Sequence, residues 1–385
     1  MGETAEVLSA ISALQAQGQR MVLATIVGVK GSTYRRAGAR LLVPDAGEPV
    51  GNLSGGCLEG EVEGLARSVM AEGRPRLALF DLTADDEVIW GWGLGCNGAI
   101  EVFIEPADKA AETAEALRLA LEQERPIAMA TVISSDLDTV PTGARVLARS
   151  GEAAEWGAGQ GSGQGAVDAA LTELAVGALS TGVTETRTIS WPDGDVRVFV
   201  EALHPPIRLL VCGAGHDAIP LVAAASALGW RVVVADDRDA FLDAGRFPGA
   251  GRFLRTEPVA VADAIDLDRR TFAVVMSHNY LRDRDYLRAL LGTDVAYIGM
   301  LGPNERLRRL LDDLGRQEVV LAGVDSAKLH GPAGLDIGAE GPEEIASAIV
   351  AEVLAVSRGR GAGFLRDRSG PIHDRAQTDR AAAAG

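Results

Sequence analysis

Two cysteines in glycine-rich segments are the residues of this chain best suited to sulfur or metal chemistry. Cys57 ends the segment Ser54-Gly-Gly-Cys57 and directly precedes an expected helix over residues 58–70, and Cys96 ends Gly93-Leu-Gly-Cys96. The N-terminus of a helix lowers the pKa of a thiol and favours the thiolate, which is the nucleophile and the metal ligand. Such a sulfur ligates a soft metal or carries a persulfide. The alternative is that each tight turn needs a small residue and that cysteine only fills space.

A second pattern, in the second half of the chain, is typical of phosphate binding. The pattern Gly213-x-Gly-x-x-Ala218 follows the apolar run 207–211 and opens a helical stretch, and Asp236 follows the next apolar run. The first glycine permits a tight turn, the second lets the backbone approach a pyrophosphate, and the acid accepts from ribose hydroxyls. The phosphate lies at the N-terminus of the helix. We predict a Rossmann fold in which Gly213, Gly215 and Asp236 contact a nucleotide, and we assign no catalytic residue, because nothing supplies a partner for hydride transfer.

Two histidines lie near the expected nucleotide crevice. Ser277-His278-Asn279 comes just past the carboxyl end of the expected strand 271–276, and His216 lies inside the glycine pattern. Ligands of open α/β sheets bind at the carboxyl edge of the strands, so both histidines are candidates to face the same ligand. The alternative is that each histidine only caps a turn. Cys212 continues an apolar strand and is expected in the core.

The elements that position these residues alternate between strands and helices. Beyond the two strands around the glycine pattern, apolar runs occur at 271–276 and 294–300, and a helical pattern follows each of them. Alternation of this kind implies an α/β fold with a doubly wound parallel sheet. We assign this Rossmann-like domain to residues 204–365 and expect residues 366–385 to be a disordered tail, because they offer little to bury.

Residues 1–203 contain a weak internal repeat. An apolar run, a second run that starts Gly-Ala-Arg, and a closing run that ends in glutamate occur at 23–27, 38–42 and 100–105, and again at 129–133, 143–147 and 196–201. We predict two related α+β units, residues 1–108 and 109–203. The second unit has no cysteine, so the cysteine loops are what the first unit adds to a shared framework.

Composition excludes several classes of partner. The formal net charge of −17 argues against nucleic acid, since phosphate backbones bind through excess Lys and Arg. The sequence has no uninterrupted apolar stretch of about 18 residues, so no membrane span is expected. The N-terminal segment is acidic rather than basic, which is not typical of a secretory signal. Three cysteines are too few for a disulfide framework, and we expect reduced thiols and a cytoplasmic protein.

Together, the motifs resemble those of the XdhC/CoxI family. The N-terminal part of the resemblance consists of Gly31-Ser-Thr-Tyr-Arg-Arg36, Gly38-Ala-Arg40, Gly51-Asn-Leu-Ser-Gly-Gly-Cys-Leu-Glu59 and Gly93-Leu-Gly-Cys96. The C-terminal part consists of Gly213-Ala-Gly-His216, Asp236-Asp-Arg238, Ser277-His-Asn-Tyr280, Tyr297-Ile-Gly299 and Gly334-Leu-Asp-Ile-Gly-Ala339. It extends from about Ala5 to Phe364. Asp217 and Pro303 depart from the pattern of the xanthine dehydrogenase helpers, which leaves the client enzyme open.

The resemblance implies an accessory protein that binds molybdenum cofactor, as molybdopterin or a dinucleotide form, and protects it while a sulfur ligand is added. The protein would then deliver it to the apoenzyme of a molybdenum hydroxylase such as xanthine dehydrogenase or carbon monoxide dehydrogenase. By position, the candidate contacts in the cysteine loops are Gly55, Gly56, Cys57, Glu59 and Cys96, with both thiols as ligands of the metal or its sulfur. The crevice candidates, which would bind the pterin phosphate or a dinucleotide, are Gly213, Gly215, His216, Asp236 and His278. We further expect a sulfur donor of the cysteine desulfurase type as a partner and a homodimer as the oligomeric state.

Two other functions stay open from the sequence. One is an oxidoreductase that uses NAD(P), which the glycine pattern favours although no acid/base pair is evident. The other is a docking scaffold in which any nucleotide is structural.

Overall fold

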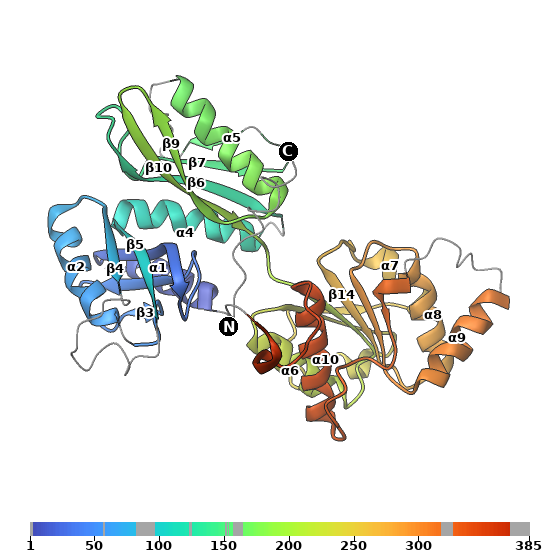
Figure 1. Ribbon diagram of the computed structural model, residues 1–385. Helices are drawn as coiled ribbons and strands as arrows, with labels where there is room; N and C mark the ends of the chain where they lie inside the picture. The colour runs from blue at the N-terminus through green and yellow to red at the C-terminus, as the bar shows by residue number, and fades with distance from the viewer. Residues whose placement is uncertain are drawn as a thin grey trace. The chain divides into compact units, whose positions relative to one another are not determined.

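The computed structural model describes residues 3–56, 58–81, 97–122, 125–150, 152, 154–156, 165–316 and 326–369. They form two compact units, Glu3–Pro205 and Pro206–Asp367. The first unit contains two antiparallel sheets and the second unit contains one parallel sheet (Figure 1). No helix in the described ranges is long and apolar enough to cross a membrane.

The first copy of the predicted repeat is a five-stranded sheet with two helices. Its elements, in chain order, are α1 (Glu3–Ala16), β1 (Met21–Ser32), β2 (Arg40–Pro44), β3 (Val50–Gly51), α2 (Glu59–Glu72), β4 (Arg76–Asp81) and β5 (Asn97–Pro106). The strands lie in the order β3-β2-β1-β5-β4, and all of their pairings are antiparallel.

The second copy has the same elements in the same order. They are α4 (Ala107–Glu122), β6 (Ile127–Ser135), β7 (Arg145–Arg149), β8 (Glu155–Trp156), α5 (Gly165–Thr181), β9 (Glu185–Trp191) and β10 (Gly194–Leu203). The strand order β8-β7-β6-β10-β9 matches that of the first copy position by position. The internal repeat predicted from the sequence is therefore confirmed.

Helices cover both faces of the first sheet, which explains the apolar run with which its central strand begins, residues 21–24. Along β1, Val22, Ala24 and Ile26 belong to the core that α2 covers, whereas Met21 and Leu23 pack with α1 and α4. Successive side chains of a strand point to opposite faces, so a sheet covered on both faces needs an unbroken apolar run. The same division recurs along β6, where α5 covers one face and α4 the other.

The two copies pack against each other through equivalent residues. A small apolar cluster joins Val27 and Phe103 of the first copy to Ile133 and Phe199 of the second copy. Val27 and Ile133 occupy equivalent positions in the apolar runs of the two copies. Phe103 and Phe199 occupy equivalent positions in the two closing strands. Equivalent residues of the two copies therefore share one cluster, as they would at the two-fold axis of a dimer.

The Rossmann unit alternates strands and helices. Its elements are β11 (Arg208–Cys212), α6 (Ala218–Ala227), β12 (Arg231–Asp236), β13 (Arg252–Arg255), α7 (Val261–Ala264), β14 (Thr271–Val275), α8 (Tyr280–Leu291), β15 (Tyr297–Met300), α9 (Asn304–Arg316), β16 (Leu329–His330) and α10 (Pro342–Ser357). All pairings are parallel, in the order β13-β12-β11-β14-β15-β16.

Two apolar cores sandwich this parallel sheet. Leu210 and Cys212 of β11 face the core formed with α7, α8 and α9, and Leu209 and Val211 face the core formed with α6 and α10. Figure 1 shows α6 and α10 on one side of the sheet and α8 and α9 on the other. The strand order reverses between β11 and β14, and this is the point at which open α/β sheets bind ligands. The predicted doubly wound sheet is confirmed.

Candidate cofactor-binding sites

The glycine turn after β11 is shaped by the neighbouring strand β14. Gly213 has a φ of +114°, and a Cβ at this position would lie 2.6 Å from the Cα of Ser277. Only glycine fits where the ends of the two strands approach so closely. The turn leads directly into α6, whose N-cap residue is Asp217. A glycine turn that opens a helix at the switch point has the form expected of a phosphate site.

His278 lies over this turn. A Cβ added to Gly215 would lie 3.5 Å from the Cδ2 of His278, so the imidazole covers the second glycine of the pattern. The Nε2 of His278 is 3.1 Å from the Oδ2 of Asp217, and the His278 side chain is 53% exposed. Its backbone has a φ of +58°, a left-handed conformation that is rare in residues other than glycine. The structure thus brings Gly213, Gly215 and His278 together, and His216 lies within the turn itself.

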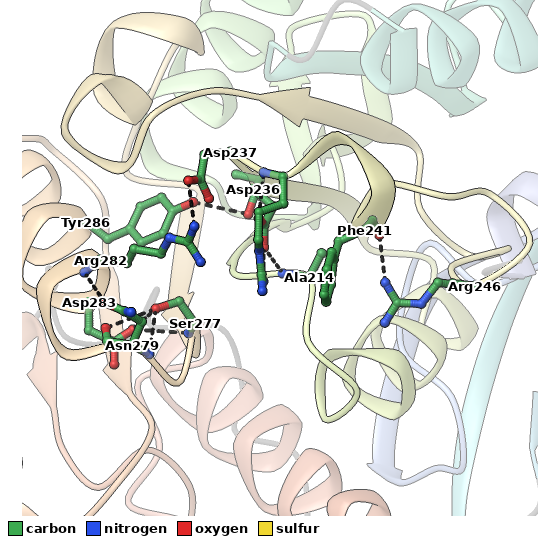
Figure 2. A network of polar contacts seen from close by, with 12 residues as sticks. Ala214, Asp236, Asp237, Phe241, Arg246, Ser277, Asn279, Arg282, Asp283 and Tyr286 are labelled. Carbon is green, nitrogen blue, oxygen red and sulfur yellow. Dashed lines mark hydrogen bonds and ion pairs between the residues drawn. The ribbon is translucent and has the colours of Figure 1, made fainter.

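Asp236 is buried against the glycine turn rather than open to the crevice. Its Oδ2 accepts from the N–H of Ala214 at 2.8 Å (Figure 2). The guanidinium of Arg238 donates to both of its oxygens at 2.8 Å. Burial alone raises the pKa of Asp236, but the hydrogen bonds from Arg238 and Ala214 outweigh it and lower the pKa to about 2. Arg238 in turn lies over the ring of Phe241, 3.7 Å from its centroid. Asp236 therefore ties the turn to the loop after β12, and its contact with a ribose stays a prediction.

A second acidic residue, which the sequence reasoning missed, fixes the loop that carries His278. Asp283, in the first turn of α8, is 1% exposed and accepts from the N–H of Ser277 at 3.1 Å and from its hydroxyl at 2.5 Å. Arg306 of α9 neutralises it at 2.6 Å. Asn279 caps α8 by accepting from the N–H groups of Leu281 and Arg282 (Figure 2). These contacts hold residues 277–279 rigidly at the carboxyl edge of β14.

A further ion pair on the same side of the sheet also escaped the sequence reasoning. Arg282 of α8 donates to Asp237 at 2.8 Å, one residue beyond Asp236 (Figure 2). The other carboxylate oxygen of Asp237 is buried and has no hydrogen-bond partner among the described residues. The sequence did contain an indication of this pair, because two aspartates, 236 and 237, follow one another. One acid at the sheet edge is enough to bind a ribose, so the second aspartate is available for another contact.

Glu59 organises the loop that precedes α2 in the first unit. Its Oε1 accepts from the N–H groups of Leu53 and Ser54, and its Oε2 accepts from those of Gly56 and Leu58 and from the Ser54 hydroxyl. Burial by itself raises the pKa of Glu59, but these hydrogen bonds lower it to about 2. The carboxylate thus stands where a bound anion would stand in a nest of backbone N–H groups. Glu59 acts on its own loop, and a direct contact with cofactor stays a prediction.

The two cysteines on which the metal prediction depends, Cys57 and Cys96, lie outside the described residues. In the described part of the chain, no cluster of three or more His, Cys, Asp or Glu side chains is arranged to hold a metal ion. Cys212 is fully buried in β11, and burial raises the pKa of its thiol. Its predicted place in the core is confirmed.

These features define a class of protein: a duplicated α+β unit with a carboxylate-organised glycine loop, followed by a Rossmann unit with a glycine turn at its switch point. Two family descriptions match the chain, "XdhC and CoxI family" over residues 14–81 and "XdhC Rossmann domain" over residues 209–353. A Bacillus subtilis protein, named as a probable xanthine dehydrogenase subunit, is 31% identical over 345 residues, which cover 89% of this chain and 95% of that protein. The chain belongs to the XdhC and CoxI family.

Two other similarities extend along most of the chain. The "Molybdenum cofactor insertion chaperone PaoD" of Escherichia coli is 23% identical over 90% of this chain and 86% of its own length. A crystal structure of a xanthine dehydrogenase from Bacillus halodurans is 30% identical, with a TM-score of 0.74, and the match covers 94% of this chain and 97% of that chain. The family predicted from the motifs is thereby confirmed.

Proposed function

We propose that this protein binds molybdenum cofactor, holds it while a sulfur ligand is added to the metal, and delivers it to the apoenzyme of a molybdenum hydroxylase. The observation that carries the proposal is the similarity, along 90% of the chain, to a protein named as a molybdenum cofactor insertion chaperone. The relative whose name refers to xanthine dehydrogenase makes that enzyme the first client to test. In this proposal the protein carries the cofactor without using it, and the redox chemistry of the cofactor takes place in the client enzyme.

The cysteine loop is the proposed place for the metal and its sulfur. Glu59 binds the N–H groups of Gly56 and Leu58, the two neighbours of Cys57 in the chain, so the backbone on both sides of the thiol is fixed. A Cβ added to Gly56 would meet no atom of the described residues within 4 Å. Cys57 and Cys96 would bind the metal or accept its sulfur as thiolates.

The Rossmann crevice is the proposed place for the phosphate of the pterin or for the nucleotide of a dinucleotide form. Gly213 and Gly215 let the ligand approach the backbone, and the N-terminus of α6 favours its negative charge. His278 and His216 would donate to the phosphate oxygens. Asp236 would support this site through Ala214 and Arg238.

The accessory role brings further partners into the proposal. A donor of the cysteine desulfurase type would supply the sulfur as a persulfide, and the cytoplasm, where thiols stay reduced, would suit both thiols. We expect a homodimer, which light scattering of the purified protein measures directly.

The decisive experiment is to purify the protein from a host that makes molybdenum cofactor and to quantify bound pterin and molybdenum. The wild type is expected to carry both, and Cys57→Ser to lose molybdenum and to mature its client more slowly. Cys212→Ala is the matched control, because that thiol is buried in the core and its removal should leave the bound metal unchanged. Absence of pterin in every preparation would contradict the proposal.

The glycine turn also favours a second candidate, an oxidoreductase that uses NAD(P). Tight binding of NADH by a protein that never contains pterin would support it. A docking scaffold is distinguished in another way: the client would mature at the normal rate when Cys57 and Cys96 are both replaced by serine.

A further inference from the structure

An exposed tyrosine lies beside the glycine loop of the first unit. Tyr34, in the loop after β1, is 64% exposed. A Cβ added to Gly55 would lie 3.6 Å from two carbons of its ring and 3.9 Å from a third. The ring is therefore packed along the Gly55 backbone on one side, while much of its surface stays in contact with water.

Both segments that form this contact are anchored. On the Tyr34 side, the Thr33 hydroxyl donates to the Arg35 carbonyl at 2.8 Å, and the Arg35 guanidinium is ion-paired with Glu3 of α1. On the other side, the Glu59 carboxylate holds the loop through Leu53, Ser54, Gly56 and Leu58. A ring held between two fixed segments is preorganised and loses little entropy when it meets a flat ligand.

Two arginines near Tyr34 in the chain are paired with carboxylates, which argues against phosphate recognition by these two side chains. Arg40 is 7% exposed and paired with Glu201, and Arg35 is paired with Glu3. What this loop offers to a ligand is an aromatic ring directly beside the segment that carries Cys57.

We infer that Tyr34 is a stacking platform for the flat ring of the cargo, so that the pterin lies against the Tyr34 ring beside the Gly55 backbone. This inference rests on the proposed function and names a residue that binds the cofactor at that site. The pyrimidine ring of a pterin is planar and heteroaromatic, as nucleobases are, and such rings stack on aromatic side chains without a need for specific hydrogen bonds. The ring of Tyr34, rather than its hydroxyl, makes the contact.

The test uses the full chain and molybdopterin extracted from a molybdenum enzyme. Equilibrium ultrafiltration, with pterin quantified by fluorescence after oxidation, gives the dissociation constant. Tyr34→Ala is expected to raise it by about 10-fold, the effect of losing one stacking contact. Tyr34→Phe, which keeps the ring, is expected to bind as the wild type does.

Leu79→Ala is the control for a general loss of exposed apolar surface, since Leu79 is 65% exposed on β4 of the same copy. It is expected to leave pterin binding unchanged. Equal affinities of the wild type and Tyr34→Ala would overturn this inference alone, and so would a Tyr34→Phe variant as weak as Tyr34→Ala. A wild-type protein that binds no pterin would overturn the proposed function and the inference with it.

Discussion

The guanidinium of Arg40 and the carboxylate of Glu201 form a buried ion pair that joins the two copies of the α+β repeat. Their atoms Nη2 and Oε2 are 2.5 Å apart, and the side chains are 7% and 6% exposed. The same pair recurs with the copies exchanged, between Arg145 and Glu105, again at 2.5 Å. Each copy thus supplies the arginine that follows its Gly-Ala and a glutamate near the end of its last strand. The unit Glu3–Pro205 therefore behaves as a dimer fused into one polypeptide.

Loss of one partner of this pair should destabilise the first unit strongly. Arg40→Ala is expected to lower the free energy of unfolding by about 3–5 kcal/mol, because Glu201 stays buried without its counter-charge. Replacement of both partners, Arg40→Met with Glu201→Leu, should recover most of the loss. Urea unfolding followed by circular dichroism measures both changes.

The exposed pair Arg20–Asp45 is the matched control for this experiment. Its side chains are 65% and 48% exposed, so Arg20→Ala should cost less than about 1 kcal/mol. An Arg40→Ala variant as stable as Arg20→Ala would show that burial does not determine how much the ion pair contributes to the free energy of unfolding.

Asp236 should make the stability of the Rossmann unit depend on pH in the acid range. Its folded pKa of about 2 is below the value of about 3.9 that is typical of an unfolded chain. The charged form therefore stabilises the fold by up to about 2 kcal/mol above pH 4, and this contribution is lost as the pH falls from about 4 toward 2. Asp236→Asn should be less stable than the wild type at pH 6, and the difference should shrink toward pH 3. Urea titrations of both proteins give both values, and a difference independent of pH would contradict the assignment.

Asp217 and His278 should have opposite effects on phosphate binding at the glycine turn. The carboxylate of Asp217 stands at the N-terminus of α6 and repels a phosphate, whereas the imidazole of His278 can donate to one. With ADP as the probe, Asp217→Asn is expected to tighten binding by about 5-fold. His278→Asn, whose asparagine tolerates the left-handed backbone, is expected to weaken it.

Isothermal titration calorimetry measures both affinities. Asp263→Asn removes the same charge from an exposed position on α7 and should change nothing. ADP that binds equally to all four proteins would place the phosphate elsewhere.

The two glycines of the turn should respond differently to a methyl group. Gly213→Ala forces a Cβ to 2.6 Å from the Ser277 backbone in a conformation unfavourable to alanine, so a loss of about 2 kcal/mol or more in stability is expected. Gly215→Ala places its Cβ 3.5 Å from a His278 side chain that can move, and should change stability by less than about 1 kcal/mol while it weakens ligand binding. Thermal unfolding of the two variants distinguishes them. Equal stabilities would show that the backbone around Ser277 shifts to make room for the Cβ at position 213 without a loss of stability.

Much of the fold could be predicted from the spacing of residues within short segments. The turn at Gly213, the acid at Asp236 and the alternation of strands and helices are encoded within short segments, because each depends on backbone conformation and on period-2 or helical patterning. The repeat was readable for the same reason: both copies keep the same order of apolar runs, Gly-Ala-Arg and a final glutamate.

What the side chains do was decided by partners far away in the chain. Arg40 gives no local indication of its partner, because Glu201 is 161 residues away and meets it only when the two copies pack together. Asp236 reads as a ribose ligand, but Arg238 and Ala214 occupy its oxygens, and Asp283 gave no local signal of its contact with Ser277. The sequence by itself determined the elements, the repeat and the family, because these depend on local patterns. Only the tertiary structure decided which charges are paired and buried and which side chains stay free for a ligand, because burial and pairing depend on how distant elements pack.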